Sequence, residues 1–94
     1  LKIPKLSIIP AGTTIQNART SKIGDNFCRD GYHLDLNHGR FTASCAIYEF
    51  IYGDIIKSTY RPSTVTEEYA TIAKNAARYA IIKPSVVTEM TDFK

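Results

Sequence analysis

The chain has 94 residues, of which 44% are hydrophobic and 22% charged, with a net charge of +3. This length allows one small domain, which buries roughly 60–65% of its unfolded surface. The basic residues are scattered along the sequence, which argues against a nucleic-acid partner. No apolar run approaches the roughly 20 residues that a membrane span needs.

The start of the chain and its cysteines say little about the cellular compartment. The chain begins with Leu1 instead of Met and shows no signal peptide, which predicts a processed or truncated product. An export signal upstream of Leu1 would fit this start, so the parent protein is a candidate for export. The two cysteines, Cys28 and Cys45, are too few for a disulfide framework.

The first third of the chain predicts a strand, a short helix and a long connection. The apolar run at residues 6–9, ended by Pro10, is typical of a buried strand. Thr13 or Thr14 is suited to cap a helix that runs to about residue 21. Residues 22–38 then form a long loop, and loops of this length are usually functional or disordered.

Two further helices are predicted in the rest of the chain. Residues 41–52 are apolar almost all round a helix, which indicates burial on more than one side, and Gly53 ends it. Thr64 and Glu67 have capping-box spacing for a last helix that Pro84 stops. One stripe of this helix is apolar: Val65, Tyr69, Ile72, Ala73, Ala76 and Ala80. The run SVVTEM, residues 85–90, is compatible with a strand.

Two of these predicted features need partners that the rest of the chain does not supply. A single strand leaves its N–H and C=O groups without a neighbouring strand, and the apolar helix at residues 41–52 has more apolar surface than its predicted neighbours cover. We therefore expect a piece of a larger α/β domain, which associates with itself or pairs with a missing N-terminal part.

The stretch RDGYHLDLNHGR, residues 29–40, places Asp30 three positions before His33, with a glycine between them. Such a pair can fix the tautomer of a histidine and leave Nε2 free as a base. The competing interpretation is that Asp30 only caps a turn and that His33 is structural. No serine or cysteine lies in an obvious nucleophile motif.

The residue types of this loop are also compatible with two other chemistries. A metal site would use two carboxylates and two imidazoles, from Asp30, His33, Asp35 and His38. Their spacing fits no strong ligand pattern, and Asn37 is well placed to cap the next helix, so we assign no metal ligand. Cys28 beside Arg29 would have a more reactive thiol, but no nucleophile signature surrounds it. Cys45 is expected in the core.

The segments IIPAGTTIQNARTSKIGD and RDGYHLDLNHGRFTASCAIYEFIYG, followed by an Ala-rich helix, resemble the C-terminal part of bacterial SGNH/GDSL hydrolases. The resemblance covers nearly the whole chain. It implies that residues 1–94 are a partial domain, the C-terminal piece of a flavodoxin-like three-layer α/β/α fold with one strand and about three helices. It also implies that His33 is the general base, that Asp30 orients it, and that no cofactor is needed.

The resemblance has two departures. Leu34 follows the histidine where many members have proline, and the nucleophilic serine block and the oxyanion donors are absent from the chain. We therefore expect a fragment of a serine esterase or acetylesterase, inactive alone, whose parent acts on an acylated small molecule or carbohydrate. Gln16, Asn17 and Arg19 are candidate substrate-binding residues. The alternative is a non-catalytic, self-associating domain.

Overall fold

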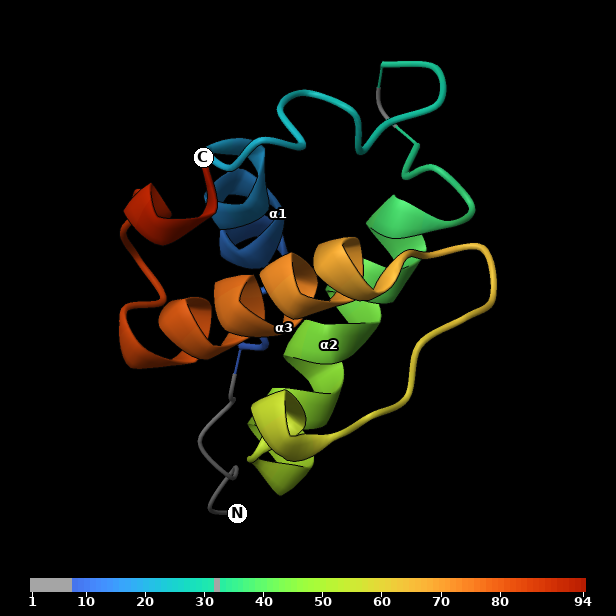
Figure 1. The fold of residues 1–94 in the computed structure, drawn as a ribbon. Coiled ribbons are helices and arrows are strands. Elements are labelled where there is room, and N and C mark those ends of the chain that lie inside the picture. Colours follow the sequence, from blue (N-terminus) through green and yellow to red (C-terminus); the bar gives the residue numbers. More distant parts are fainter. Residues whose placement is uncertain (1–7, 32) are drawn as a thin grey trace, which may run out of the picture.

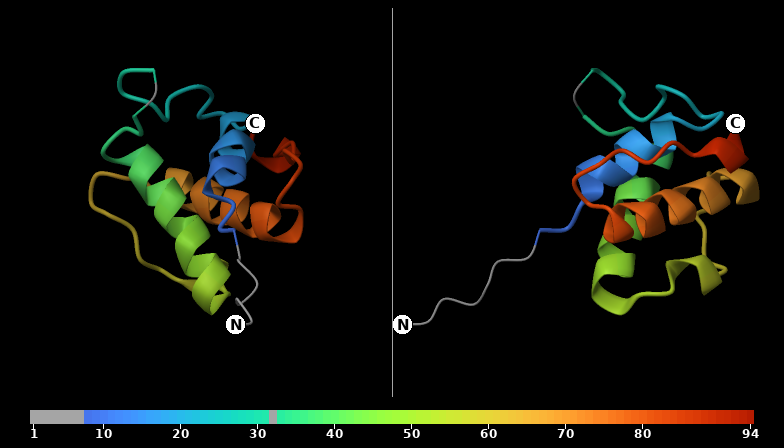
Figure 2. Two further views of the ribbon diagram at one scale, coloured as in Figure 1. Left: turned by 180° about the vertical axis from the view of Figure 1, so that it is seen from behind. Right: turned by 90° about the vertical axis from the view of Figure 1, so that its left-hand side faces the viewer.

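Three α-helices form the framework of the described chain, residues 8–31 and 33–94, in a computed structural model (Figure 1). They are α1 (Ala11–Arg19), α2 (His38–Tyr52) and α3 (Glu67–Ile82). There are also two short 3₁₀ helices among the described residues. η1 (Ile55–Lys57) follows α2, and η2 (Thr91–Phe93) lies just before the C-terminus. The connection between α1 and α2 runs along one end of the bundle, at the top of both views in Figure 2.

Helix α3 holds the bundle together because it is rich in alanine and is buried on two sides. Each of the three helices contacts the other two. Small side chains allow helix axes to approach closely, so both α1 and α2 pack against α3. One core cluster lies between α2 and α3 and contains Phe41, Cys45, Ala46, Ile55, Val65, Ala70, Ala73 and Ala77. The other joins α1, α3 and the C-terminal tail and contains Ile15, Ala18, Ile23, Phe27, Ile72, Ala76 and Met90.

The predicted α/β fold is wrong. Among the described residues there is no strand and no sheet, and the only strand-like pairing is a single antiparallel bridge between Cys28 and Leu34. Of the strand predicted at residues 6–9, positions 6 and 7 lie outside the described residues, while Ile8 and Ile9 have irregular backbone. Ile9 instead packs its side chain against the α2–α3 core, so its apolar character reflects helix-bundle packing.

The strand considered for residues 85–90 is also absent, since this segment forms an irregular tail. Two of its backbone N–H groups bond to side chains from the α1 region and not to a neighbouring strand. The N–H of Thr88 donates to Oδ1 of Asn17 at 2.6 Å, and the N–H of Met90 donates to Oγ1 of Thr20 at 2.8 Å. Met90, 1% exposed, anchors the tail in the core.

The helix boundaries confirm some predictions and change others. Helix α2 ends at Tyr52, and Gly53 follows with φ 72°, in the left-handed region that favours glycine, as predicted. Helix α3 has Thr66 as its cap in place of Thr64, because the Oγ1 of Thr66 accepts a hydrogen bond from Tyr69 N at 3.2 Å. Helix α1 begins at Ala11, directly after Pro10, without a side-chain cap.

Buried polar groups hold η1 and the following loop against the helices. One carboxylate oxygen of Glu49 accepts from Ile55 N at 3.0 Å, and the other lies 3.3 Å from Nε of Arg78 on α3. Lys74, also on α3, donates its Nζ proton to the carbonyl of Ser58 at 2.5 Å. None of the described helices combines the length and apolar character that crossing a bilayer requires.

Candidate functional site in the 28–34 hairpin

The Asp30–His33 pair lies in a tight hairpin within the long connection. Its base is the Cys28–Leu34 bridge, and inside it Arg29 N donates to the carbonyl of His33 at 2.8 Å. Gly31 has φ 94°, a conformation that side chains with a Cβ rarely adopt, so glycine is required for this turn. The fold therefore brings residues 30 and 33 together across three peptide bonds, as the D-x-x-H spacing predicts.

The Asp30 carboxylate binds His33 through both of its oxygens. Oδ2 lies 2.5 Å from Nδ1 of the imidazole, and Oδ1 accepts the backbone N–H of His33 at 2.7 Å. Because the carboxylate faces Nδ1, the neutral imidazole carries its proton there and keeps the Nε2 lone pair on the opposite side. The two side chains remain 43% and 50% exposed, respectively, so the pair lies at the surface of this chain.

Asp35 is not available for metal binding because it caps α2. Its Oδ1 accepts from the backbone N–H groups of Asn37 and His38 at 2.8 and 3.0 Å, and its Oδ2 accepts from Gly39 N at 2.7 Å. Asn37 occupies the N-cap position but makes no capping hydrogen bond with its side chain. The prediction that Asn37 caps this helix is therefore wrong, because Asp35, two positions earlier, makes the capping hydrogen bonds. An aspartate two residues before the N-cap was the sequence signal that would have indicated this.

The half-buried ring of His38 packs against α3 and does not join a group of metal ligands among the described residues. It is the first residue of α2, and its ring packs edge-on against Tyr69 with centroids 4.7 Å apart. Within the described part of the chain, no three or more His, Cys, Asp or Glu residues are grouped as metal ligands would be.

The two cysteines differ in exposure, and both are free thiols. Cys28 lies exposed at the base of the hairpin, whereas Cys45 is buried in α2, as predicted for the core residue. Burial raises the pKa of the Cys45 thiol to about 12, which keeps it protonated and unreactive near neutral pH.

The three candidate substrate-binding residues on α1 do not form one surface. Gln16 and Arg19 are exposed and bind each other, with NH1 of Arg19 donating to Oε1 of Gln16 at 2.9 Å. Arg19 also lies 3.2 Å from Asp25. Asn17 is fully buried, and its amide bridges the carbonyl of Ala76 at 3.2 Å and the N–H of Thr88 at 2.6 Å.

A cavity of about 400 Å³ begins a few residues beyond the hairpin, and sequence reasoning did not find it. It lies between α2, η1 and the loop at residues 58–64. Leu36 and Asn37 border it on the hairpin side, while Phe41, Tyr48 and Ile55 give it mainly apolar walls. The irregular 58–64 loop forms one wall of this cavity, and only the tertiary structure shows where that loop lies.

Comparison with known proteins gives the chain a family. A model of the DUF4886 family, described as a domain of unknown function, matches residues 2–80. The chain belongs to the DUF4886 family. No curated protein matches it.

The crystal structure of a DUF4886 family protein from Bacteroides uniformis ATCC 8492 has the same fold over this region. It is 47% identical to the chain, with a TM-score of 0.91 over 95% of the chain. The match covers 35% of the Bacteroides protein, so the chain spans about a third of the length of this DUF4886 relative.

Proposed function

We propose that Asp30 and His33 are the acid–base half of a serine-hydrolase site that cleaves ester bonds, acetyl esters included. The nucleophile and the oxyanion donors come from outside these 94 residues. The observation that carries the proposal is the contact of 2.5 Å between Oδ2 of Asp30 and Nδ1 of His33. The contact has the polarity that an orienting carboxylate and a general base require.

In this arrangement Nε2 of His33 takes the proton of an attacking hydroxyl and later returns it to the leaving alkoxide. Asp30 holds the imidazole in the tautomer with the Nδ1 proton and stabilises the imidazolium that forms. The second hydrogen bond, from His33 N to Oδ1 of Asp30, fixes the carboxylate against the backbone. The base therefore keeps its direction although both side chains are partly exposed.

Two further considerations support the proposal. The sequence around the hairpin resembles the D-x-x-H block of SGNH/GDSL hydrolases. The DUF4886 relative is about three times as long as this chain, so a longer family member has room for the missing serine and oxyanion donors. The substrate class that follows is an acylated small molecule or an acylated carbohydrate.

A second candidate function is supported by the same carboxylate. Asp30 accepts a backbone hydrogen bond across a turn that Gly31 makes possible, which by itself is a common way to stabilise a loop. In this case the chain is a non-catalytic domain, and the imidazole contact only adds rigidity to the hairpin.

Kinetics of a longer DUF4886 protein that contains this hairpin separate the two functions. For the hydrolase, His33→Ala lowers kcat/KM for a nitrophenyl ester by on the order of 10³–10⁴-fold, and Asp30→Asn lowers it comparably or less. His38→Ala is the matched control and leaves the rate nearly unchanged, because its ring packs on Tyr69 and takes no part in the proposed proton transfer. Thermal melts of all three variants exclude unfolding as the cause.

The 94-residue chain alone gives no turnover above background under this proposal. A His33→Ala enzyme with nearly normal kcat/KM supports the structural role and overturns the hydrolase. Hydrolysis by the pure 94-residue chain that a fluorophosphonate blocks would contradict the assignment of the nucleophile to another part of the protein.

A further inference from the structure

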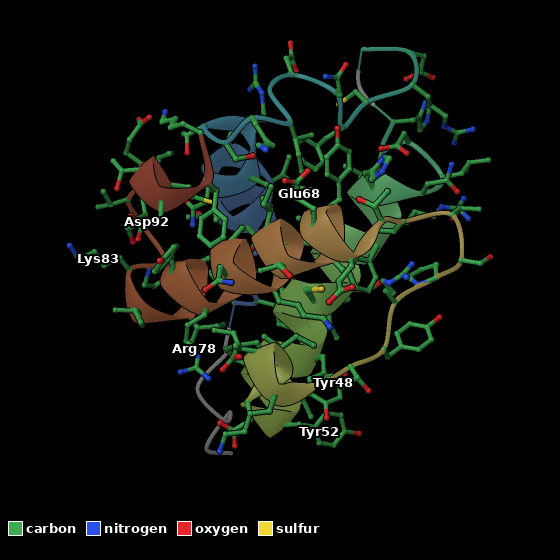
Figure 3. All side chains as sticks on the ribbon, viewed as in Figure 1. Tyr48, Tyr52, Glu68, Arg78, Lys83 and Asp92 are labelled. Atoms are coloured by element: carbon green, nitrogen blue, oxygen red, sulfur yellow. The ribbon has the colours of Figure 1, made fainter. Side chains whose placement is uncertain are left out.

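Helix α2 turns an apolar face away from the bundle. Its inner side contacts α1 and α3 through buried residues such as Phe41, Cys45 and Ala46. On its outer side five large apolar residues are 39–73% exposed. They are Ile47, Tyr48, Phe50, Ile51 and Tyr52. Tyr48 and Tyr52 are labelled in Figure 3, where they point away from α3, and their rings lie 5.1 Å apart.

The apolar surface extends beyond α2. Ile56 of η1 is also 44% exposed, but it borders a different hollow with Arg61, Glu67 and Lys74, so we call the five α2 residues alone the α2 apolar face. Tyr48 also lines the 400 Å³ cavity, together with the exposed Tyr60 and Leu36, so the face continues into a hollow. Tyr48 therefore joins the exposed apolar residues of α2 to the apolar cavity on the same side of the molecule.

No charge interrupts the α2 apolar face. After Arg40 the only charged residue of α2 is Glu49, which is buried and bound to Ile55 N and Arg78 on the inner side. Surfaces that stay in water usually mix charges with apolar residues, and a contiguous apolar area of this kind marks an interaction site.

The occupant of this face follows from the length of the relative. The Bacteroides DUF4886 protein contains this fold, with a TM-score of 0.91, as about a third of its chain. The remaining two thirds can pack where the shared part exposes most apolar surface, and five of the twelve exposed large apolar residues of the described chain lie on α2, with smaller groups such as Ile82, Val86 and Val87 elsewhere. We propose that the α2 apolar face is the surface on which the rest of a longer DUF4886 chain packs. This inference does not depend on the Asp30–His33 chemistry.

Cysteine labelling tests the proposal on both proteins as they exist. Ile51→Cys is placed on the face, and Glu68→Cys is the matched control on α3, where Glu68 is an exposed partner of Lys22 (Figure 3). Both are made in a Cys28→Ser background, in which the buried thiol of Cys45 stays silent to maleimide at pH 7. The same two positions receive cysteine in the Bacteroides protein after its own accessible cysteines are replaced by serine.

In the 94-residue chain we expect both cysteines to label quickly. In the longer protein we expect the Ile51 position to label at least about tenfold more slowly than in the short chain, with the Glu68 position as the reference. Equal labelling of the Ile51 position in the two proteins overturns the proposal. Protection already present in the short chain that grows with its concentration also overturns it, because a second copy then covers the face.

A charged substitution gives an independent readout if a cysteine variant misfolds. Ile51→Asp places a carboxylate that is solvated in the short chain and buried in the long one. We expect it to leave the melting temperature of the 94-residue chain nearly unchanged and to lower that of the longer protein clearly. A longer protein that melts normally with this substitution contradicts the proposal.

Discussion

At the scale of single residues, Gly39 shows how closely the hairpin approaches α2. A Cβ built on Gly39 would lie 2.6 Å from the carbonyl oxygen of Phe27 and 3.1 Å from both Oδ2 of Asp35 and Cβ of Leu34. The backbone carbonyl of Phe27 is itself engaged, since it accepts Asp35 N at 2.9 Å. The base of the hairpin therefore rests directly on the helix backbone, and any side chain at position 39 would displace it.

We predict that Gly39→Ala lowers the free energy of unfolding by about 1–3 kcal/mol, the usual cost of overpacking. Alanine favours helix over glycine by up to about 1 kcal/mol, so the steric term must outweigh the propensity term. Gly12→Ala is the matched control, because Gly12 lies in α1 with no atom within 4 Å of the added Cβ. Urea denaturation of both variants should give changes of opposite sign. Two changes of the same sign would mean that the hairpin is not seated on α2.

At the scale of elements, the start of α2 depends on one carboxylate outside the helix. Asp35 accepts the first three free N–H groups, those of Asn37, His38 and Gly39, and its negative charge lies at the positive end of the helix dipole. The same aspartate lies two residues after His33, so the cap links the catalytic candidate to the helix that lines the cavity.

Removing this cap should therefore affect both the helix and the hairpin. We expect Asp35→Ala to destabilise the chain by about 1–2 kcal/mol, as loss of a helix cap does. Asn37→Ala, at the nominal N-cap, should cost far less, since its side chain makes no capping hydrogen bond. Thermal melts followed by circular dichroism compare the two variants. A larger loss from Asn37→Ala than from Asp35→Ala would contradict the capping assigned here.

At the scale of the whole molecule, Asn17 connects three parts that are distant in sequence. Its buried amide joins α1 to the carbonyl of Ala76 on α3 and to Thr88 in the C-terminal tail. Thr20 makes a second link from the end of α1 to Met90. These bonds replace the strand pairing that the sequence of the tail suggested.

We predict that Asn17→Ala lowers the free energy of unfolding by about 1–3 kcal/mol, because it leaves the partly buried N–H of Thr88 without its acceptor and removes the bond to the carbonyl of Ala76. Amide hydrogen exchange at Thr88 should accelerate with it. Gln16→Ala, the neighbouring exposed position, is the control and should change stability little. If Asn17→Ala exchanges Thr88 at the native rate, the tail is held by Met90 and not by the amide.

The sequence by itself determined the features that depend on interactions between residues close together in the chain. The D-x-x-H spacing indicated the Asp30–His33 contact, the apolar run indicated α2, and Gly53 indicated its end. The position of Cys45 indicated a core residue. In each case the deciding interaction lies within a few residues or within one helix, so local pattern is sufficient.

Only the tertiary structure decided the fold class and the partners of the polar residues. A short apolar run such as that ending at Ile9 is equally suited to a strand and to a segment packed on helices, and the neighbour it meets decides between them. Asn17 was similar: an amide on a helix looks like a pocket residue until the carbonyl of Ala76, 59 residues away, is found beside it. The exposure of α2 likewise depends on which helices reach it, which its own sequence does not encode.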